Sequence, residues 1–206
     1  IYETLDKDGY FIFENHYMVD ILKYNQYDTI YHEHIRNYSL KSLIYLFNLY
    51  SLKVVDCEVL ERYNGSIKVI VSKNKKIKTH KRVYKTLNKE IKFGLTKKKV
   101  WDKFRLNTKK SKQNLIKLLY KLKDNNKTVV GNSCPCRSSV LLNYCGIGKD
   151  LIPYIAEQPS SPKLGLYLPG QHIPIVNNKI LVKDQPDYIL LLAWHYTKPI
   201  IKYLKN

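Results

Sequence analysis

Ionisable side chains are concentrated in one short segment, residues 27–34, which reads Tyr-Asp-Thr-Ile-Tyr-His-Glu-His. Two imidazoles, two carboxylates and two phenols lie within these eight residues. Ionisable groups at this density are costly to bury and ordinary on an exposed loop, so burial decides whether they carry chemistry. A polar surface loop is therefore one interpretation of the segment.

The segment also has the composition of a site for proton transfer. Histidine titrates near neutral pH, and an adjacent carboxylate fixes its tautomer and supports the imidazolium form. His34 could take this role beside Glu33 or Tyr31. In an extended segment Tyr31 and Glu33 would share one side and the histidines the other, so a bend is needed to bring the three groups together.

A metal site is a third interpretation of the same residues. His32 and His34 would share one face of a strand, and Glu33 could add an oxygen ligand. No further ligand stands near them in the sequence, so no metal is expected. Three cysteines could also be read as a metal set, but small side chains filling the core are the preferred interpretation. These are Cys134, Cys136 and Cys145.

The elements around the segment would position it. Residues 9–13 form an apolar, aromatic run, which predicts a buried strand from which Glu14 emerges at a site. The cluster itself is expected in an extended stretch. Ser39 is a suitable N-cap for a helix that runs to about Tyr50.

A lysine-rich region separates the predicted first and last parts of the chain. Residues 53–60 and 66–73 predict a β-hairpin around Asn64-Gly65. Residues 73–112 predict two helices, or a helix and a linker, and the helical pattern of residues 115–122 ends at Asp124.

The last eighty or so residues alternate between strand and helix patterns, which is typical of a Rossmann-like α/β fold. Gly146 is expected to cap the C-terminus of the first helix. Residues 168–174 are too rich in Pro and Gly for regular structure. The predicted strands cover residues 128–131, 151–156 and 188–192, and the predicted helices cover residues 138–144 and the chain from about Thr197.

Composition indicates a soluble, cytoplasmic protein with reduced thiols and no membrane segment. The formal charge of +19 would usually favour nucleic acid as a partner. Only five of the 36 basic residues are arginine, however, and the lysine excess accompanies many Asn, Ile and Tyr residues, as AT-rich codons would produce. Nucleic acid is therefore not the expected partner.

The opening residues, Ile1 onward, look like the interior of a helix and suggest a fragment.

Several motifs together resemble the S-adenosylmethionine-dependent C-methyltransferases that act on deoxysugar nucleotides. The resemblance starts in residues 27–34 and spans nearly the whole chain in order. Its further motifs are Tyr38-Ser39-Leu40, Asn64-Gly65-Ser66, Leu141-Leu142-Asn143-Tyr144-Cys145-Gly146-Ile147, Leu168-Pro169-Gly170-Gln171-His172-Ile173-Pro174 and Pro186-Asp187-Tyr188.

The resemblance implies an activity and roles for particular residues. The reaction would remove a proton beside a keto group of the sugar and transfer a methyl group to that carbon. His34 would be the general base, and Tyr31 and Glu33 would orient it or steady developing charge. The residues implied in binding the nucleotide-sugar substrate are Arg137, Asn143, Lys163 and His172.

The resemblance also implies a domain layout. Residues 1–73 would be the C-terminal part of a methyltransferase domain, residues 74–124 a lysine-rich helical linker, and residues 125–206 a Rossmann-like C-terminal domain. The fold class expected is therefore α/β, with the end of one Rossmann-like domain followed by a second.

This sequence departs from the family pattern in two respects. Residues 131–138 read Gly-Asn-Ser-Cys-Pro-Cys-Arg-Ser, where the family pattern is similar to Gly-Tyr-Gly-Ala-Pro-Ala-Lys-Gly. Arg137 would thus present a planar fork to a diphosphate instead of a point charge, and the loss of the second glycine would limit backbone approach to an anion.

The second departure is that no glycine-rich turn follows a strand before Tyr31, so the site for S-adenosylmethionine is expected to be incomplete. A separate N-terminal methyltransferase half is an expected partner. A non-catalytic sugar-nucleotide-binding remnant and a basic nucleic-acid-binding protein remain the alternative functions.

Overall fold

The computed structural model describes residues 1–204, which group into two compact units. The first unit comprises Ile1–Gln26 and His34–Leu106, and the second comprises Tyr27–Glu33 with the chain from Asn107 onward. The predicted domain boundaries, after residues 73 and 124, stay a prediction.

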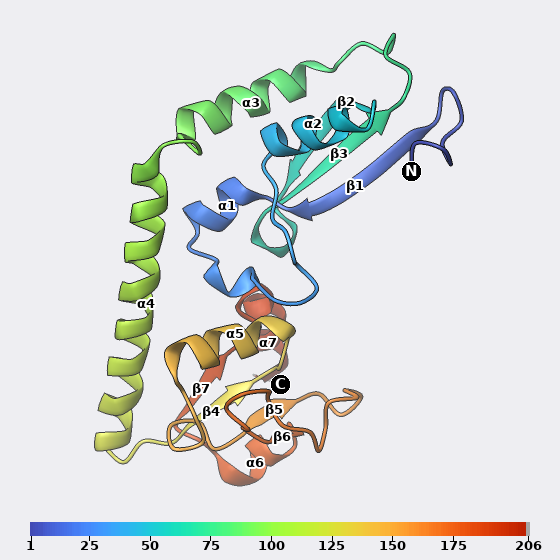
Figure 1. The fold of residues 1–206 in the computed structure, drawn as a ribbon. Coiled ribbons are helices and arrows are strands. Elements are labelled where there is room, and N and C mark those ends of the chain that lie inside the picture. The colour runs from blue at the N-terminus through green and yellow to red at the C-terminus, as the bar shows by residue number, and fades with distance from the viewer. Residues whose placement is uncertain (205–206) are drawn as a thin grey trace. The chain divides into compact units, whose positions relative to one another are not determined.

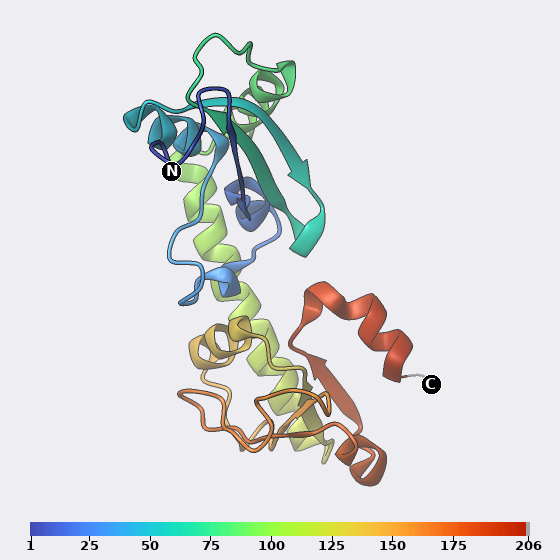
Figure 2. The same cartoon turned by 90° about the vertical axis from the view of Figure 1, so that its right-hand side faces the viewer.

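The first unit is built on a three-stranded antiparallel sheet in the order β1-β3-β2 (Figure 2). Alternate residues of β1 are partly buried, because Phe11 and Phe13 turn toward the core and pack edge-on against Phe47. The hairpin predicted around Asn64-Gly65 is confirmed. The strands are β1 (Tyr10–His16), β2 (Lys53–Leu60) and β3 (Ser66–Ser72).

Helix α2 (Leu40–Leu49), labelled in Figure 1, contributes to the core of this unit, and two side chains cap its N-terminus. The predicted N-cap is confirmed, since the Ser39 side chain accepts a hydrogen bond from the amide of Ser42 at 3.1 Å. The buried carboxylate of Glu90 accepts two more, from the amides of Leu40 at 2.6 Å and Lys41 at 3.1 Å. A negative charge there is favoured by the dipole at the helix N-terminus.

The lysine-rich region forms two helices, α3 (Lys81–Phe93) and α4 (Lys98–Asp124), which is the first of the two predicted alternatives. Gly94 ends α3 in the left-handed conformation, with φ of 84°. Residues 98–106 of α4 belong to the first unit, and the rest of the helix belongs to the second.

The second unit is a four-stranded parallel sheet in the order β6-β5-β4-β7. The chain steps outward from β4 to β5 and β6, and then returns to the other side of β4 for β7 (Figure 1). Side chains of α4, α5 and the sheet share one core, in which Leu142, Ile147 and Ile155 are fully buried. The strands are β4 (Val129–Asn132), β5 (Ile155–Glu157), β6 (Ile175–Asn177) and β7 (Tyr188–Leu191), and the helices after α4 are α5 (Cys136–Cys145), α6 (Ile180–Asp184) and α7 (Thr197–Leu204).

The predicted α/β class and the predicted parallel, Rossmann-like arrangement are confirmed. Gly146 caps α5 in the left-handed conformation, with φ of 71°, as its position after the helical pattern indicated. Strand β6 and helix α6 were not predicted, because three and five residues are too few to show a periodicity.

The extended conformation predicted for the ionisable segment is wrong. The chain before it forms helix α1 (Met18–Lys23), and the segment opens with a short 3₁₀ helix, η1 (Tyr27–Thr29). Asp28 and Thr29 are buried there, so packing and not strand pairing fixes this backbone. Within residues 1–204, no helix combines the length and the apolar character needed to cross a membrane.

Candidate functional site

A cleft of about 730 Å³ opens in the second unit where its parallel strands end. Asn132 ends β4, Glu157 ends β5, Asn178 follows β6, and a short 3₁₀ helix, η3 (Trp194–Tyr196), follows β7. In open α/β sheets, ligands bind beyond the carboxyl ends of the strands, where the order of strands reverses. The residues that line the cleft are Asn132, Ser133, Pro135, Glu157, Gln158, Pro159, Ser160, Lys163, Asn178, Ala193, His195, Tyr196, Pro199 and Ile200.

Charged side chains hold the loop after β4 in place at the cleft. The Lys163 ammonium donates to the carbonyl of Cys134 at 2.5 Å, and the amide of Cys134 donates to the Glu157 carboxylate at 2.8 Å. Ser133 has φ of 64°, a left-handed conformation that favours glycine.

His195 contributes a neutral imidazole to the cleft at physiological pH. Burial, and then the positive charge of Arg137, lower the pKa of His195 to about 4. A neutral imidazole can donate one hydrogen bond and accept another, whereas it adds no positive charge for a phosphate. Among the described residues that line the cleft, Lys163 is the one with a cationic side chain.

A buried ionic cluster fixes residues 27–33 against α5 within the second unit. The Asp28 carboxylate lies 3.9 Å from Nη1 of Arg137 and accepts a hydrogen bond from the Trp194 indole at 2.7 Å. The Arg137 guanidinium also lies over the Trp194 ring, 5.0 Å from its centre. Burial raises the pKa of Asp28, while the charge of Arg137 and the indole hydrogen bond act against that rise.

Arg137 is buried, whereas its predicted role in binding the nucleotide-sugar substrate would need an accessible guanidinium. Only 4% of the residue is exposed, and its Nη1 has no hydrogen-bond partner among the described residues. A substrate phosphate would have to reach this buried group past its contacts with Asp28 and Trp194. The role of Arg137 toward substrate stays a prediction, and its observed contacts stabilise the fold.

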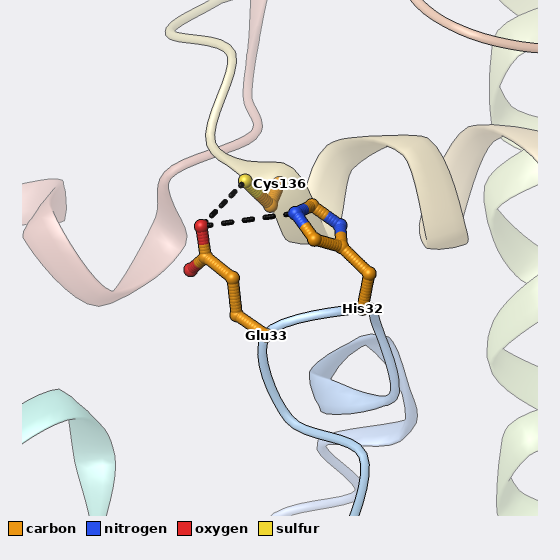
Figure 3. Close-up of side chains that lie close together, drawn as sticks. All are labelled: His32, Glu33 and Cys136. Atoms are coloured by element: carbon orange, nitrogen blue, oxygen red, sulfur yellow. Dashed lines mark hydrogen bonds and ion pairs between the residues drawn. The ribbon is translucent and has the colours of Figure 1, made fainter.

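Tyr31 and Glu33, two of the three predicted catalytic residues, lie in the second unit. Tyr31 is half-buried, and burial raises the pKa of its phenol. Glu33 is exposed, with its carboxylate 3.9 Å from Nε2 of His32 and 3.8 Å from Sγ of Cys136 (Figure 3). The contact with Cys136 was not foreseen from the sequence.

His34, the predicted general base, belongs to the first unit. Its ring centre lies 4.3 Å from that of His16, the buried last residue of β1. The His16 ring also stacks on Tyr63 at 6.4 Å, and beside this strand end Ser66 donates a hydrogen bond to Glu14. Sequence reasoning missed His16, although a histidine that ends an apolar strand was the available signal.

Asn143 and His172 lie outside the group of residues that lines the cleft. The Asn143 amide donates to the carbonyls of Ser139 and Pro169, at 2.7 Å and 2.9 Å, and so ties α5 to the loop of residues 168–174. His172 is exposed on that loop. Of the four residues predicted to bind substrate, Lys163 is the one that lines the cleft, and all four roles stay predictions.

Comparison with known proteins assigns the family. Residues 62–206 match the model of the C-methyltransferase C-terminal domain, so the chain belongs to that family, as the sequence motifs predicted. The chain is also 35% identical, over 207 aligned residues, to C-methyltransferase NovU from Streptomyces niveus. That alignment covers 98% of this chain and 49% of the relative, so the chain spans about half the length of the curated protein it matches.

Proposed function

We propose that this chain is the C-terminal portion of an S-adenosylmethionine-dependent C-methyltransferase that acts on a nucleotide-linked keto-deoxysugar. The observation that carries the proposal is the cleft at the strand ends of the second unit, in a domain of the C-methyltransferase family. The name of the similar protein, a C-methyltransferase, supports the reaction type.

The cleft has groups suited to a nucleotide diphosphate. Lys163 offers one positive charge to the diphosphate, and Tyr196, which is 46% exposed, offers a ring face to the base. His195 and Asn132 add neutral hydrogen-bonding groups for the sugars. A ligand would also gain from the Glu157 contact, which keeps the loop after β4 ordered before binding.

In the proposed reaction, His34 removes the proton from the sugar carbon beside the keto group. The electron pair left on the carbon is delocalised into the carbonyl. S-adenosylmethionine, held by the donor-binding half, would supply the methyl group for that carbon. Tyr31 and Glu33 would orient the base or steady the charge on the enolate oxygen and the imidazolium.

The donor-binding half of the methyltransferase is the proposed partner of the first unit. β1 lies at an edge of the sheet, and two of its side chains are largely exposed, Tyr10 at 54% and Ile12 at 61%. A free edge and apolar side chains favour the addition of further sheet. We place the donor-binding portion there, whether it belongs to the same polypeptide or to a second subunit.

Calorimetric titration of the 206-residue chain with a thymidine diphosphate sugar tests the proposal. Lys163→Met should weaken binding at least tenfold, because the cleft loses its cation. Lys183→Met, on the exposed surface of α6, is the matched control and should bind as the unmodified chain does.

Other outcomes of this titration point to the alternatives. Failure of every sugar nucleotide, together with DNA binding that weakens steeply with salt, would favour a basic nucleic-acid-binding protein. Sugar-nucleotide binding without turnover in the reconstituted enzyme would favour a non-catalytic remnant.

A further inference from the structure

Three potential metal ligands converge at the start of α5 in the second unit. They are the imidazole of His32, the carboxylate of Glu33 and the thiol of Cys136 (Figure 3). Glu33 and Cys136 are 103 positions apart in the sequence, and the fold brings them together. His32 and Glu33 are exposed and Cys136 is half-buried, so an ion can reach them from solvent.

The distances between the three donor atoms are close to those between the ligand atoms around a bound metal ion. Glu33 Oε1 lies 3.9 Å from His32 Nε2 and 3.8 Å from Cys136 Sγ, and all three donor atoms lie within 4.8 Å of one another. Tetrahedral coordination with bonds of about 2.0–2.3 Å places ligand atoms roughly 3.3–3.7 Å apart. The two distances to Glu33 Oε1 exceed this range by a few tenths of an ångström.

Two features of the surrounding structure hold the donors in place. The contacts of Asp28 with Arg137 and Trp194 fix the segment that carries His32 and Glu33. Cys136 is the first residue of α5, so the helix backbone fixes the position of its thiol. Part of the entropy cost of assembling the site is therefore already met by folding.

We propose that His32, Glu33 and Cys136 form a site for a divalent transition metal of the zinc type, with a fourth position open to solvent. Sulfur and imidazole ligands select zinc or cobalt over calcium and magnesium, which take oxygen ligands. Three protein ligands with one open position are typical of an accessible site and not of a closed structural one.

Metal binding has a consequence for catalysis that rests on the proposed function. A bound ion would engage the carboxylate of Glu33, which is predicted to support the base. The metal-loaded protein would then transfer protons more slowly, and a chelator would restore the rate. Metal binding itself does not depend on this consequence.

The test is a titration of the reduced, tag-free 206-residue chain with Co²⁺, followed by absorption spectroscopy. One equivalent should bind and give a near-ultraviolet charge-transfer band from a thiolate ligand. Cys136→Ser should abolish the band, and His32→Ala should weaken binding at least tenfold. Two controls should leave the band and the metal affinity unchanged: Cys57→Ser, at a buried position of β2, and His172→Ala, at an exposed position of the loop of residues 168–174.

Three results would overturn the proposal. They are the absence of Co²⁺ and Zn²⁺ binding below millimolar concentration, a charge-transfer band that survives Cys136→Ser, and an affinity that His32→Ala leaves unchanged. Sugar-nucleotide binding measured on the same samples separates this result from a failure of the proposed function, because the metal test needs neither substrate nor activity.

Discussion

Substitution of Asp28 should destabilise the second unit strongly. Asp28→Ala leaves the Arg137 guanidinium, which is only 4% exposed, without its counter-charge and removes the acceptor of the Trp194 indole. Removing one partner of a buried ion pair lowers the free energy of unfolding by about 3–5 kcal/mol. Asp28→Asn keeps an acceptor for the indole, and because burial raises the pKa of the carboxyl group it replaces, it should cost much less than Asp28→Ala at pH 7.

The converse substitution should cost less. In Arg137→Met the carboxylate left behind can take up a proton, since burial already raises the pKa of Asp28. The double variant with Asp28→Asn and Arg137→Met should be less destabilised than the sum of the single variants, by about 1–3 kcal/mol. Urea unfolding at pH 7, followed by tryptophan fluorescence and circular dichroism, measures these free energies of unfolding.

The raised pKa of the Asp28 carboxyl group predicts that the free energy of unfolding depends on pH. Because its pKa is raised in the folded protein, its contribution to stability is fully present below the unfolded value of 3.8 and is lost as the pH rises through the folded value. The free energy of unfolding of the unmodified chain should therefore fall relative to Asp28→Asn as the pH rises through that window. A cost under 1 kcal/mol for Asp28→Ala, or costs that simply add, would refute this account of the cluster.

Two further substitutions test the contacts that shape the rest of the chain. Gly170→Ala should cost about 2–3 kcal/mol, because φ is 88° and the new methyl group would lie 2.0 Å from Oδ1 of Asn143; thermal unfolding measures the loss. Gly165→Ala, with φ of 80° and open space around it, is the control and should cost only about 1–2 kcal/mol. Glu90→Ala should cost about 2–3 kcal/mol, because the amides at the start of α2 lose a charged acceptor, and amide hydrogen exchange at that helix end should rise. Equal costs for the two glycines, or unchanged exchange at α2, would contradict these assignments.

Local signals in the sequence were enough to predict much of the fold. Ser39 before an apolar periodic run indicated the start of α2, and Gly146 after another indicated the end of α5. Asn64-Gly65 between two β-branched runs predicted the hairpin. Each of these features depends on the conformation of a few neighbouring residues, which is why composition and spacing suffice.

Contacts between distant residues could not be predicted in the same way. The hydrogen bond from Trp194 to Asp28 joins positions 166 apart, and the contact from Cys136 to Glu33 joins positions 103 apart. The sequence therefore left the metal interpretation of His32 without a further ligand. It also could not show that Arg137 is buried, because burial depends on how η1, α5 and η3 pack together.

The most direct test of the proposed chemistry is proton exchange at the sugar carbon. The chain would be combined with its donor-binding portion, supplied with the keto-deoxysugar nucleotide in D₂O, and kept free of S-adenosylmethionine. We expect deuterium at the carbon beside the keto group, with His34→Ala lowering the exchange rate at least a hundredfold and leaving substrate affinity within threefold. Exchange that persists at the unmodified rate in His34→Ala would contradict the assignment of His34 as the base.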